Sequence, residues 1–236
     1  MCRGAALFIA SVLVVVLFGQ MTATSASSLS MSEVSENTRL IRPITAVMTF
    51  ADGTTEVKRG QGFVIGNRLF TVYHTLAPRL KKALPAKREI YVAGMLMTPV
   101  YTHAAHDIAI FEIPETWCEP HCHALSASNL PNLNPDRQVY WVQEAQGKRL
   151  VQAGRVQHYA WLSEAPPALP NGAQAPCQRH LIVEVDTPFR PGTSGSPVFD
   201  ATTDAIVGMI QGSLARAGGD TGYFKPISCL LPLAPL

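Results

Sequence analysis

The chain has 236 residues, of which only 15% are charged, and its 19 Lys and Arg nearly balance its 17 Asp and Glu. One short basic cluster, between Arg79 and Arg88, contains no aromatic residue. This composition argues against a nucleic-acid partner, and the simplest interpretation of the cluster is a solvated surface.

An uncharged apolar run lies near the start of the chain. Residues Ala5 to Gly19 follow a single Arg3 and precede the small residues Thr22 to Ser28, a pattern typical of a secretory signal peptide. The run has about 15 residues, whereas a membrane span needs nearer 20. We expect cleavage after Ala26, with 1–26 as the signal peptide. The mature protein would be periplasmic or secreted, without stable membrane association; an uncleaved anchor is the alternative.

The remaining sequence predicts an all-β protein. Residues 27–40 are small and polar, as in a flexible arm. Two sets of six short apolar runs with turn signals follow, within 41–125 and 138–236, and the turn-rich segment 126–137 joins them. Six such runs are what one closed antiparallel barrel requires. We therefore predict two six-stranded antiparallel β-barrels.

Three residues with catalytic chemistry stand next to apolar runs. His74 ends the run that contains Thr71 and Val72, and Asp107 precedes Ile108-Ala109-Ile110. Ser194 lies in the turn Gly192-Thr193-Ser194-Gly195, just before another run. The order histidine, aspartate, serine is that of the chymotrypsin-type triad, in which the histidine takes the serine proton and the aspartate orients the histidine.

With these motifs the chain resembles the trypsin/chymotrypsin-like serine protease superfamily, and within it the bacterial branch of glutamyl endopeptidases and HtrA-type proteases. The matching segments are Gly62–Ile65, Thr71–His74, Asp107–Ile110, Gly192–Pro197 and Ile206–Met209. The resemblance implies two barrels with the active site between them. It further implies a trypsin-like serine endopeptidase that acts on proteins or peptides through an acyl-enzyme and needs no cofactor. The signal peptide predicts that this enzyme is exported.

The glycines beside Ser194 favour an oxyanion hole. Without a Cβ, Gly192 and Gly195 permit positive φ and close approach of a substrate carbonyl, so the N–H groups of Gly192 and Ser194 can bind the developing negative charge. Ser196 is a second serine in this turn, but the oxyanion geometry favours Ser194. By analogy with the family, the segment Gln211-Gly212-Ser213 would pair with the substrate backbone.

The sequence departs from the family pattern at four positions. Tyr73 replaces a small residue before the histidine, and Thr193 replaces the aspartate that pairs with a new amino terminus in animal members. Pro188 and Ile210 stand where a lysine- or arginine-reading aspartate and a glutamate-reading histidine would lie, so neither preference is supported. Because of Tyr73 and Thr193, an inactive binding protein with the protease fold is the alternative function.

Four cysteines remain after cleavage: Cys118, Cys122, Cys177 and Cys229. An even number in an exported chain indicates two disulfides. We favour Cys118 with Cys122 and Cys177 with Cys229, but four cysteines allow three pairings and the sequence does not choose.

The segment Cys118-Glu119-Pro120-His121-Cys122-His123 has a second interpretation. Its two thiols and two imidazoles could ligate zinc, or attach haem through a spacing one residue longer than usual. We expect a local disulfide here and no metal or haem; a redox protein is the weaker alternative.

Overall fold

The computed structural model describes residues 38–79, 84–117, 133–145, 148–161, 181–216 and 218–230. The signal peptide, nearly all of the arm, and Cys118, Cys122 and Cys177 lie outside these residues, as does the whole segment from Cys118 to His123. The predictions made for them stay predictions, as do the domain boundaries. Among the described residues no helix combines the length and apolar character needed to cross a membrane.

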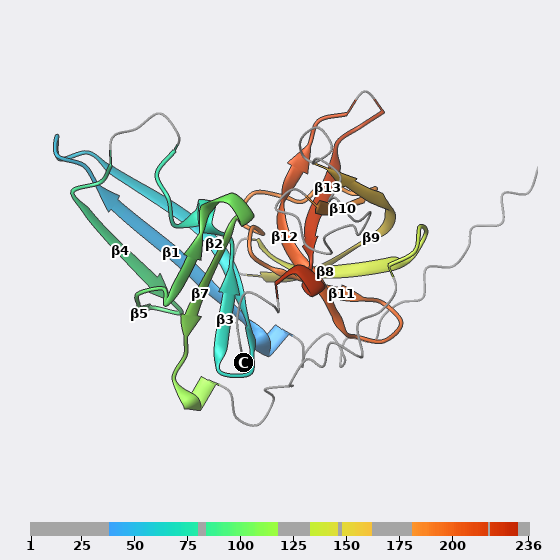
Figure 1. Cartoon of the computed structure of the whole chain (residues 1–236), viewed down its shortest axis with the longest axis horizontal. Helices are drawn as coiled ribbons and strands as arrows, with labels where there is room; N and C mark the ends of the chain where they lie inside the picture. Colours follow the sequence, from blue (N-terminus) through green and yellow to red (C-terminus); the bar gives the residue numbers. More distant parts are fainter. Residues whose placement is uncertain are drawn as a thin grey trace, which may run out of the picture.

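The first unit is a seven-stranded antiparallel sheet in the order β5-β4-β1-β2-β3-β7-β6, on the left of Figure 1. Its strands are β1 (Ile41–Thr49), β2 (Thr55–Ile65), β3 (Arg68–Thr71), β4 (Lys87–Val92), β5 (Met95–Leu96), β6 (Tyr101–His103) and β7 (Ile108–Glu112). Residues 96–101 are one of the six apolar runs counted in the first half, and they predict a single strand. The structure has β5 and β6 instead, with Pro99 between them, because proline has no N–H to donate to a ladder.

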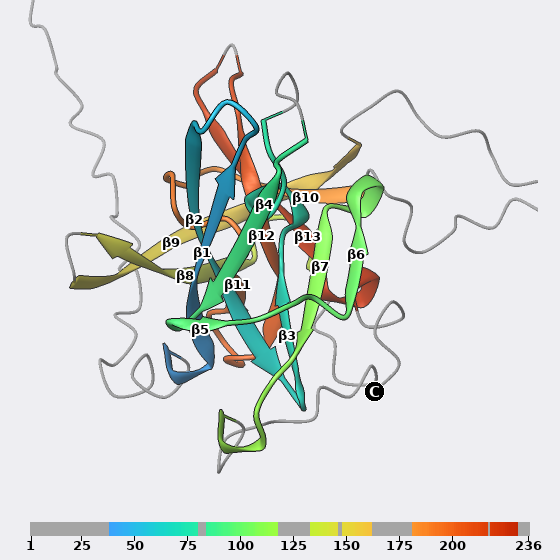
Figure 2. The same cartoon turned by 90° about the vertical axis from the view of Figure 1, so that its left-hand side faces the viewer.

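The second unit is a closed barrel of six strands, in the order β10-β13-β12-β11-β8-β9. It lies behind the sheet in Figure 2. They are β8 (Gln138–Ala145), β9 (Lys148–Trp161), β10 (Leu181–Val185), β11 (Pro197–Asp200), β12 (Ile206–Leu214) and β13 (Thr221–Pro226). Short 3-10 helices complete the described structure: η1 (Thr38–Leu40), η2 (Tyr73–Thr75), η3 (Ala104–His106), η4 (Glu115–Trp117) and η6 (Ile227–Cys229). The all-β class is confirmed, as one closed barrel and one half-barrel sheet.

The central strands of the sheet are buried on both faces. Val64 and Leu69 point into the core of the first unit. Their neighbours Phe63 and Phe70 point the other way, into a cluster shared with the barrel. Because both faces exclude water, these strands are nearly continuous apolar runs rather than alternating ones.

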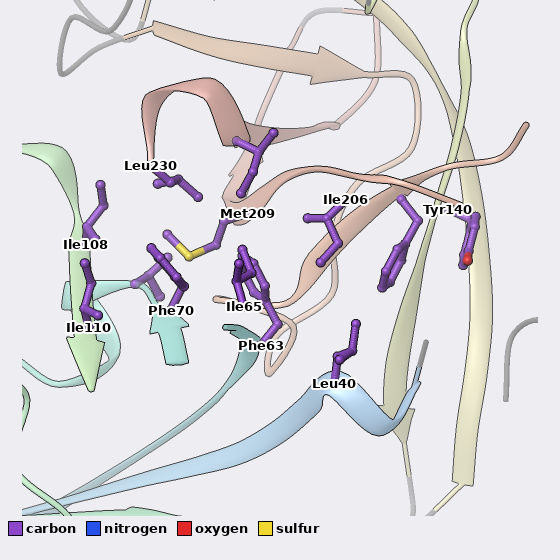
Figure 3. Close-up of a cluster of buried hydrophobic side chains, with 13 residues drawn as sticks. Leu40, Phe63, Ile65, Phe70, Ile108, Ile110, Tyr140, Ile206, Met209 and Leu230 are labelled. Carbon is purple, nitrogen blue, oxygen red and sulfur yellow. The ribbon is translucent and has the colours of Figure 1, made fainter. Parts of the chain in front are cut away.

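The shared cluster joins the two units (Figure 3). Phe63 and Phe70 stack with ring centroids 5.8 Å apart, and Ile108 adds to them from β7. From the barrel side come Met209 of β12 and Leu230, which follows η6. A fully buried side chain of this size contributes about 1.5–3 kcal/mol, so this contact fixes how the sheet and the barrel lie against each other.

Candidate active site

His74 and Asp107 form a hydrogen-bonded pair where β3 ends and β7 begins, in the sheet unit. His74 lies in η2, just beyond the end of β3, and 46% of its side chain is exposed. Its Nδ1 lies 2.7 Å from Asp107 Oδ2, and its backbone N–H donates to Asp107 Oδ1 at 2.8 Å. Two oxygens of one carboxylate therefore hold both the ring and the backbone of His74. With Nδ1 donating, Nε2 is left to accept a proton.

Asp107 reaches His74 through an uncommon backbone conformation. It follows η3 with φ +55°, in the left-handed region that aspartate tolerates better than most residues. Its N–H donates to the carbonyl of Ala104 at 3.1 Å, which closes the turn before β7 begins. The turn directs the carboxylate toward the end of β3, the neighbour of β7 in the sheet.

Ser194 is half-buried in a tight turn that leads into β11. The N–H of Ser196 donates to the carbonyl of Thr193 at 2.9 Å, and Gly195 between them has φ +87°. A Cβ on Gly195 would lie 2.0 Å from the carbonyl oxygen of Gln61. Only glycine fits this place, because the turn both requires a positive φ and presses against β2.

β2 places the serine turn beside the histidine helix. The N–H of Gln61 donates to the carbonyl of Ser194 at 2.9 Å. A Cβ on Gly60 would lie 2.9 Å from that carbonyl and equally close to the side chain of Thr75, the residue after His74. The structure thus gathers the three predicted residues around one strand. Among the described residues, His74 and Asp107 are hydrogen-bonded, whereas the Ser194 hydroxyl and His74 are not.

Within the described residues, the turn before the serine leaves two backbone donors without a protein acceptor. Thr193 closes this turn, since its N–H and its hydroxyl both donate to the carbonyl of Arg190, at 3.2 and 2.7 Å. Gly192 has φ +92°, and nothing lies within 4 Å of where its Cβ would be. In the part of the chain that the structure describes, the N–H groups of Gly192 and Ser194 donate to no protein acceptor. Both remain available to a ligand oxygen.

Ser196 is enclosed rather than presented. It is fully buried, and its hydroxyl donates to Gln61 Oε1 at 2.7 Å. A serine held in this way cannot attack a substrate carbonyl, so Ser194 is the only serine of this turn whose side chain is partly exposed.

β12 continues past the serine turn as a strand with one open edge. β11 is in register with β12 only from Ile206 to Met209, and Ile210 then exchanges two backbone hydrogen bonds with the serine turn. Among the described residues, the segment 211–213 has a strand partner only on its β13 side, so its other edge is open. The Ser213 hydroxyl accepts from the N–H of Phe189 and donates to its carbonyl, at 2.8 and 2.9 Å, which ties this edge to the segment before the serine turn.

Two ionisable side chains that the sequence did not predict lie near the histidine–aspartate pair. Lys58 Nζ donates to the carbonyl of His74 at 2.8 Å. Burial lowers the pKa of Lys58, with Glu56 and Asp107 opposing the shift. Burial, and then the negative charge of Asp107, raise the pKa of Tyr223, whose ring lies against Gly212.

Gln61 is a further residue that the sequence analysis missed. A polar residue between Gly60 and Gly62, just before the apolar run Phe63–Ile65, was the available signal. For Lys58 the sequence holds no such signal, because exposed lysines on strands are common.

An all-β pair of units with a histidine–aspartate pair on one and a serine turn on the other is the arrangement of chymotrypsin-type serine proteases. The family model described as a trypsin-like peptidase domain matches residues 60–209 of this chain. The chain belongs to this family of serine proteases, which act on proteins or peptides, and the resemblance inferred from the sequence is confirmed. No curated protein sequence matches the chain.

Solved structures show the same fold at low sequence identity. The active form of the Rv3671c protease from M. tuberculosis is 18% identical, with a TM-score of 0.57 over 82% of this chain and 78% of that chain. A serine-to-alanine variant of that protease, in an inactive form, is 16% identical, with a TM-score of 0.56 over 86% of this chain and 88% of that one. The two-unit trypsin-like fold is therefore confirmed.

Proposed function

We propose that this protein is an exported trypsin-like serine endopeptidase that uses His74, Asp107 and Ser194 as its catalytic triad. The observation that carries the proposal is the double hydrogen bond between Asp107 and His74, which lies beside a glycine-rich turn that presents Ser194. A carboxylate in this position holds imidazole in the tautomer that accepts a serine proton.

The chemistry follows from these three side chains. Ser194 Oγ attacks the carbonyl carbon of a peptide bond while His74 Nε2 takes the hydroxyl proton, and Asp107 stabilises the imidazolium. The tetrahedral oxyanion accepts hydrogen bonds from the N–H groups of Gly192 and Ser194. Collapse breaks the peptide C–N bond, and His74 returns the proton to the leaving amine. Water, activated by His74, then hydrolyses the acyl-enzyme ester on Ser194.

The substrate would bind as an extended strand along Gln211, Gly212 and Ser213, the open edge of β12. Backbone hydrogen bonds of this kind tolerate many sequences and leave selectivity to side-chain pockets. No step requires a metal or another cofactor, and we propose no nucleic-acid or membrane partner for the mature chain.

Hydrolysis of fluorescently labelled casein tests this function. We expect the wild type to release fluorescent peptides and Ser194→Ala to release none. Equal release by both proteins would show that the hydrolysis comes from a contaminant and would contradict the proposal.

Export is the second part of the proposal. It is supported by the apolar run of residues 5–19 and the small residues after it. Amino-terminal sequencing of protein from the growth medium or periplasm should find a start near Ser27. A start at Met1 in the membrane fraction would instead identify an anchored protease.

An inactive binding protein with the protease fold is the second candidate. The specific observation in its favour is that Ser194 and His74 are not hydrogen-bonded to each other, although catalytic hydrogen bonds of free enzymes often form only with substrate. Such a protein would hold a peptide along Gln211, Gly212 and Ser213 without cleaving it. Failure of Ser194 to react with a serine-directed probe would favour this candidate.

A further inference from the structure

Gln211 lies at a bulge where β12 leaves the serine turn. On the β13 side, Ile210 pairs with Phe224 and Gly212 with Tyr223, so Gln211 is an extra residue in the register. A bulge redirects the side chain of the strand that carries it. Here Gln211 is 6% exposed, and its side chain leaves the barrel to reach the sheet unit.

The amide of Gln211 meets the peptide bond that precedes Asp107. Gln211 Nε2 donates to the carbonyl oxygen of His106 at 3.2 Å. The nitrogen of that same peptide bond belongs to Asp107 and donates to Ala104, 3.1 Å away. The peptide plane is thus held on one side by η3 and on the other by the barrel. Because the nitrogen of Asp107 lies in this plane, the orientation of the plane helps to set the φ of Asp107, which is +55°.

We propose that Gln211 is a positioning residue, which orients Asp107 and through it His74 by holding the peptide bond between His106 and Asp107. The inference rests on the proposed function, since it concerns the same triad. Without the amide, the His106 carbonyl loses its donor from the barrel, and Asp107 can leave a backbone conformation that few non-glycine residues adopt. The carboxylate would then no longer meet His74 with both oxygens.

The location of Gln211 also links substrate binding to the triad. Its backbone belongs to the open edge of β12, along which we propose that the substrate lies, while its side chain holds the loop of the catalytic acid. Gln211 thus belongs to the barrel strand along which the substrate would lie, and it also contacts the loop of the sheet unit that carries Asp107.

Gln211→Met tests this role, because methionine has a similar length and volume but no donor. Gln143→Met is the matched control: Gln143 is also buried, 5% exposed, on β8, two strands away from β12 in the barrel. Fluorophosphonate labelling of Ser194 should slow roughly 10- to 100-fold per folded molecule in Gln211→Met, the loss typical of a misplaced catalytic group. Gln143→Met should label at the wild-type rate.

A second measurement does not depend on the reactivity of Ser194. In a Ser194→Ala background, the imidazole N–H proton that His74 donates to Asp107 should give a downfield NMR resonance, which Gln211→Met broadens or removes and Gln143→Met retains. If the wild type does not label but this resonance depends on Gln211, the proposed function fails while the positioning role stands.

A Gln211→Met protein that labels at the wild-type rate and keeps the resonance would overturn the role. Should Gln211→Met not fold, Gln211→Ala replaces it. Alanine has no side-chain donor and no titratable group, so the same losses are expected. A Gln211→Ala protein with the wild-type labelling rate and resonance would equally overturn the role.

Discussion

The side chains of Gln61 and Ser196 meet across the boundary between the sheet and the barrel, with 2.7 Å from Gln61 Oε1 to Ser196 Oγ. The backbone N–H of the same glutamine donates to the carbonyl of Ser194 at 2.9 Å. One residue of the sheet unit therefore binds the serine turn at two points, the carbonyl of Ser194 and the hydroxyl of Ser196. In the opposite direction, Gln211 of the barrel binds the loop of Asp107.

Loss of the Gln61 side chain should destabilise the protein through Ser196. Gln61→Met removes the acceptor of a fully buried hydroxyl, which should cost about 1–3 kcal/mol of unfolding free energy. Adding Ser196→Ala removes the unsatisfied hydroxyl and should recover part of that loss. Urea unfolding of the two single variants and the double variant measures the coupling. Strictly additive effects would show that the two side chains do not interact.

Alanine at the two glycines beside Ser194 should give unequal effects. Both glycines have positive φ, +87° at Gly195 and +92° at Gly192. Backbone strain alone should therefore lower the free energy of unfolding by about 1–3 kcal/mol at each position. Gly195→Ala also drives a Cβ to 2.0 Å from the Gln61 carbonyl, whereas Gly192→Ala meets nothing within 4 Å. Thermal unfolding should show a much larger loss for Gly195→Ala, and equal losses would contradict the packing at Gly195.

Asp200 should make stability depend on pH in the acid range. It is fully buried and accepts hydrogen bonds from Arg137 and from the N–H groups of Thr202 and Thr203. Burial favours the neutral acid, but the hydrogen bonds from Arg137 and the two threonines outweigh it and lower the pKa of Asp200. Its ionised form therefore stabilises the fold above the unfolded-state pKa of about 3.9, and this contribution is lost as the pH falls through the lower folded-state value.

Asp200→Asn checks this prediction. At neutral pH we expect a loss of about 3 kcal/mol, because the variant leaves Arg137 without its charged partner. The difference from the wild type should shrink in urea unfolding below about pH 4. A difference that stays constant over the whole acid range would contradict the role of the ionised carboxylate.

The cysteines should all be oxidised in the exported protein. Cys229 is buried, at 1% exposure, and Cys177 is the partner that we favour for it. Free thiols seldom persist outside the cytoplasm. Thiol titration of denatured, unreduced protein should detect none of Cys118, Cys122, Cys177 and Cys229. Four reactive thiols would rule out both disulfides.

Local patterns predicted most strands, because apolar runs and turn residues are close in sequence. They did not reveal that Phe63 and Val64 are buried on opposite faces, since the second face is covered by the barrel. Nor did they show that Leu40, at the end of the predicted arm, packs into the shared cluster. Burial of this kind depends on how the two units meet.

The candidate site likewise contains some residues that the sequence reveals and others that only the folded structure reveals. His74 and Ser194 stand out because each has a local motif around it. Gln61 and Gln211 act through partners 135 and 105 residues away, so their side-chain contacts follow only from the folded chain. The sequence analysis named Gln211 for its backbone and did not foresee its side chain.

Covalent labelling with a fluorophosphonate probe tests the triad most directly, because an ordinary serine hydroxyl does not react with it. The wild type should be modified at Ser194, Ser194→Ala should not react, and His74→Ala should react only in trace amounts. Ser196→Ala should retain most of the labelling, since Ser196 is enclosed. If folded, processed wild type resists the probe under conditions where a control serine protease reacts, the result contradicts the proposed endopeptidase activity. The inactive peptide-binding protein would then be the remaining candidate.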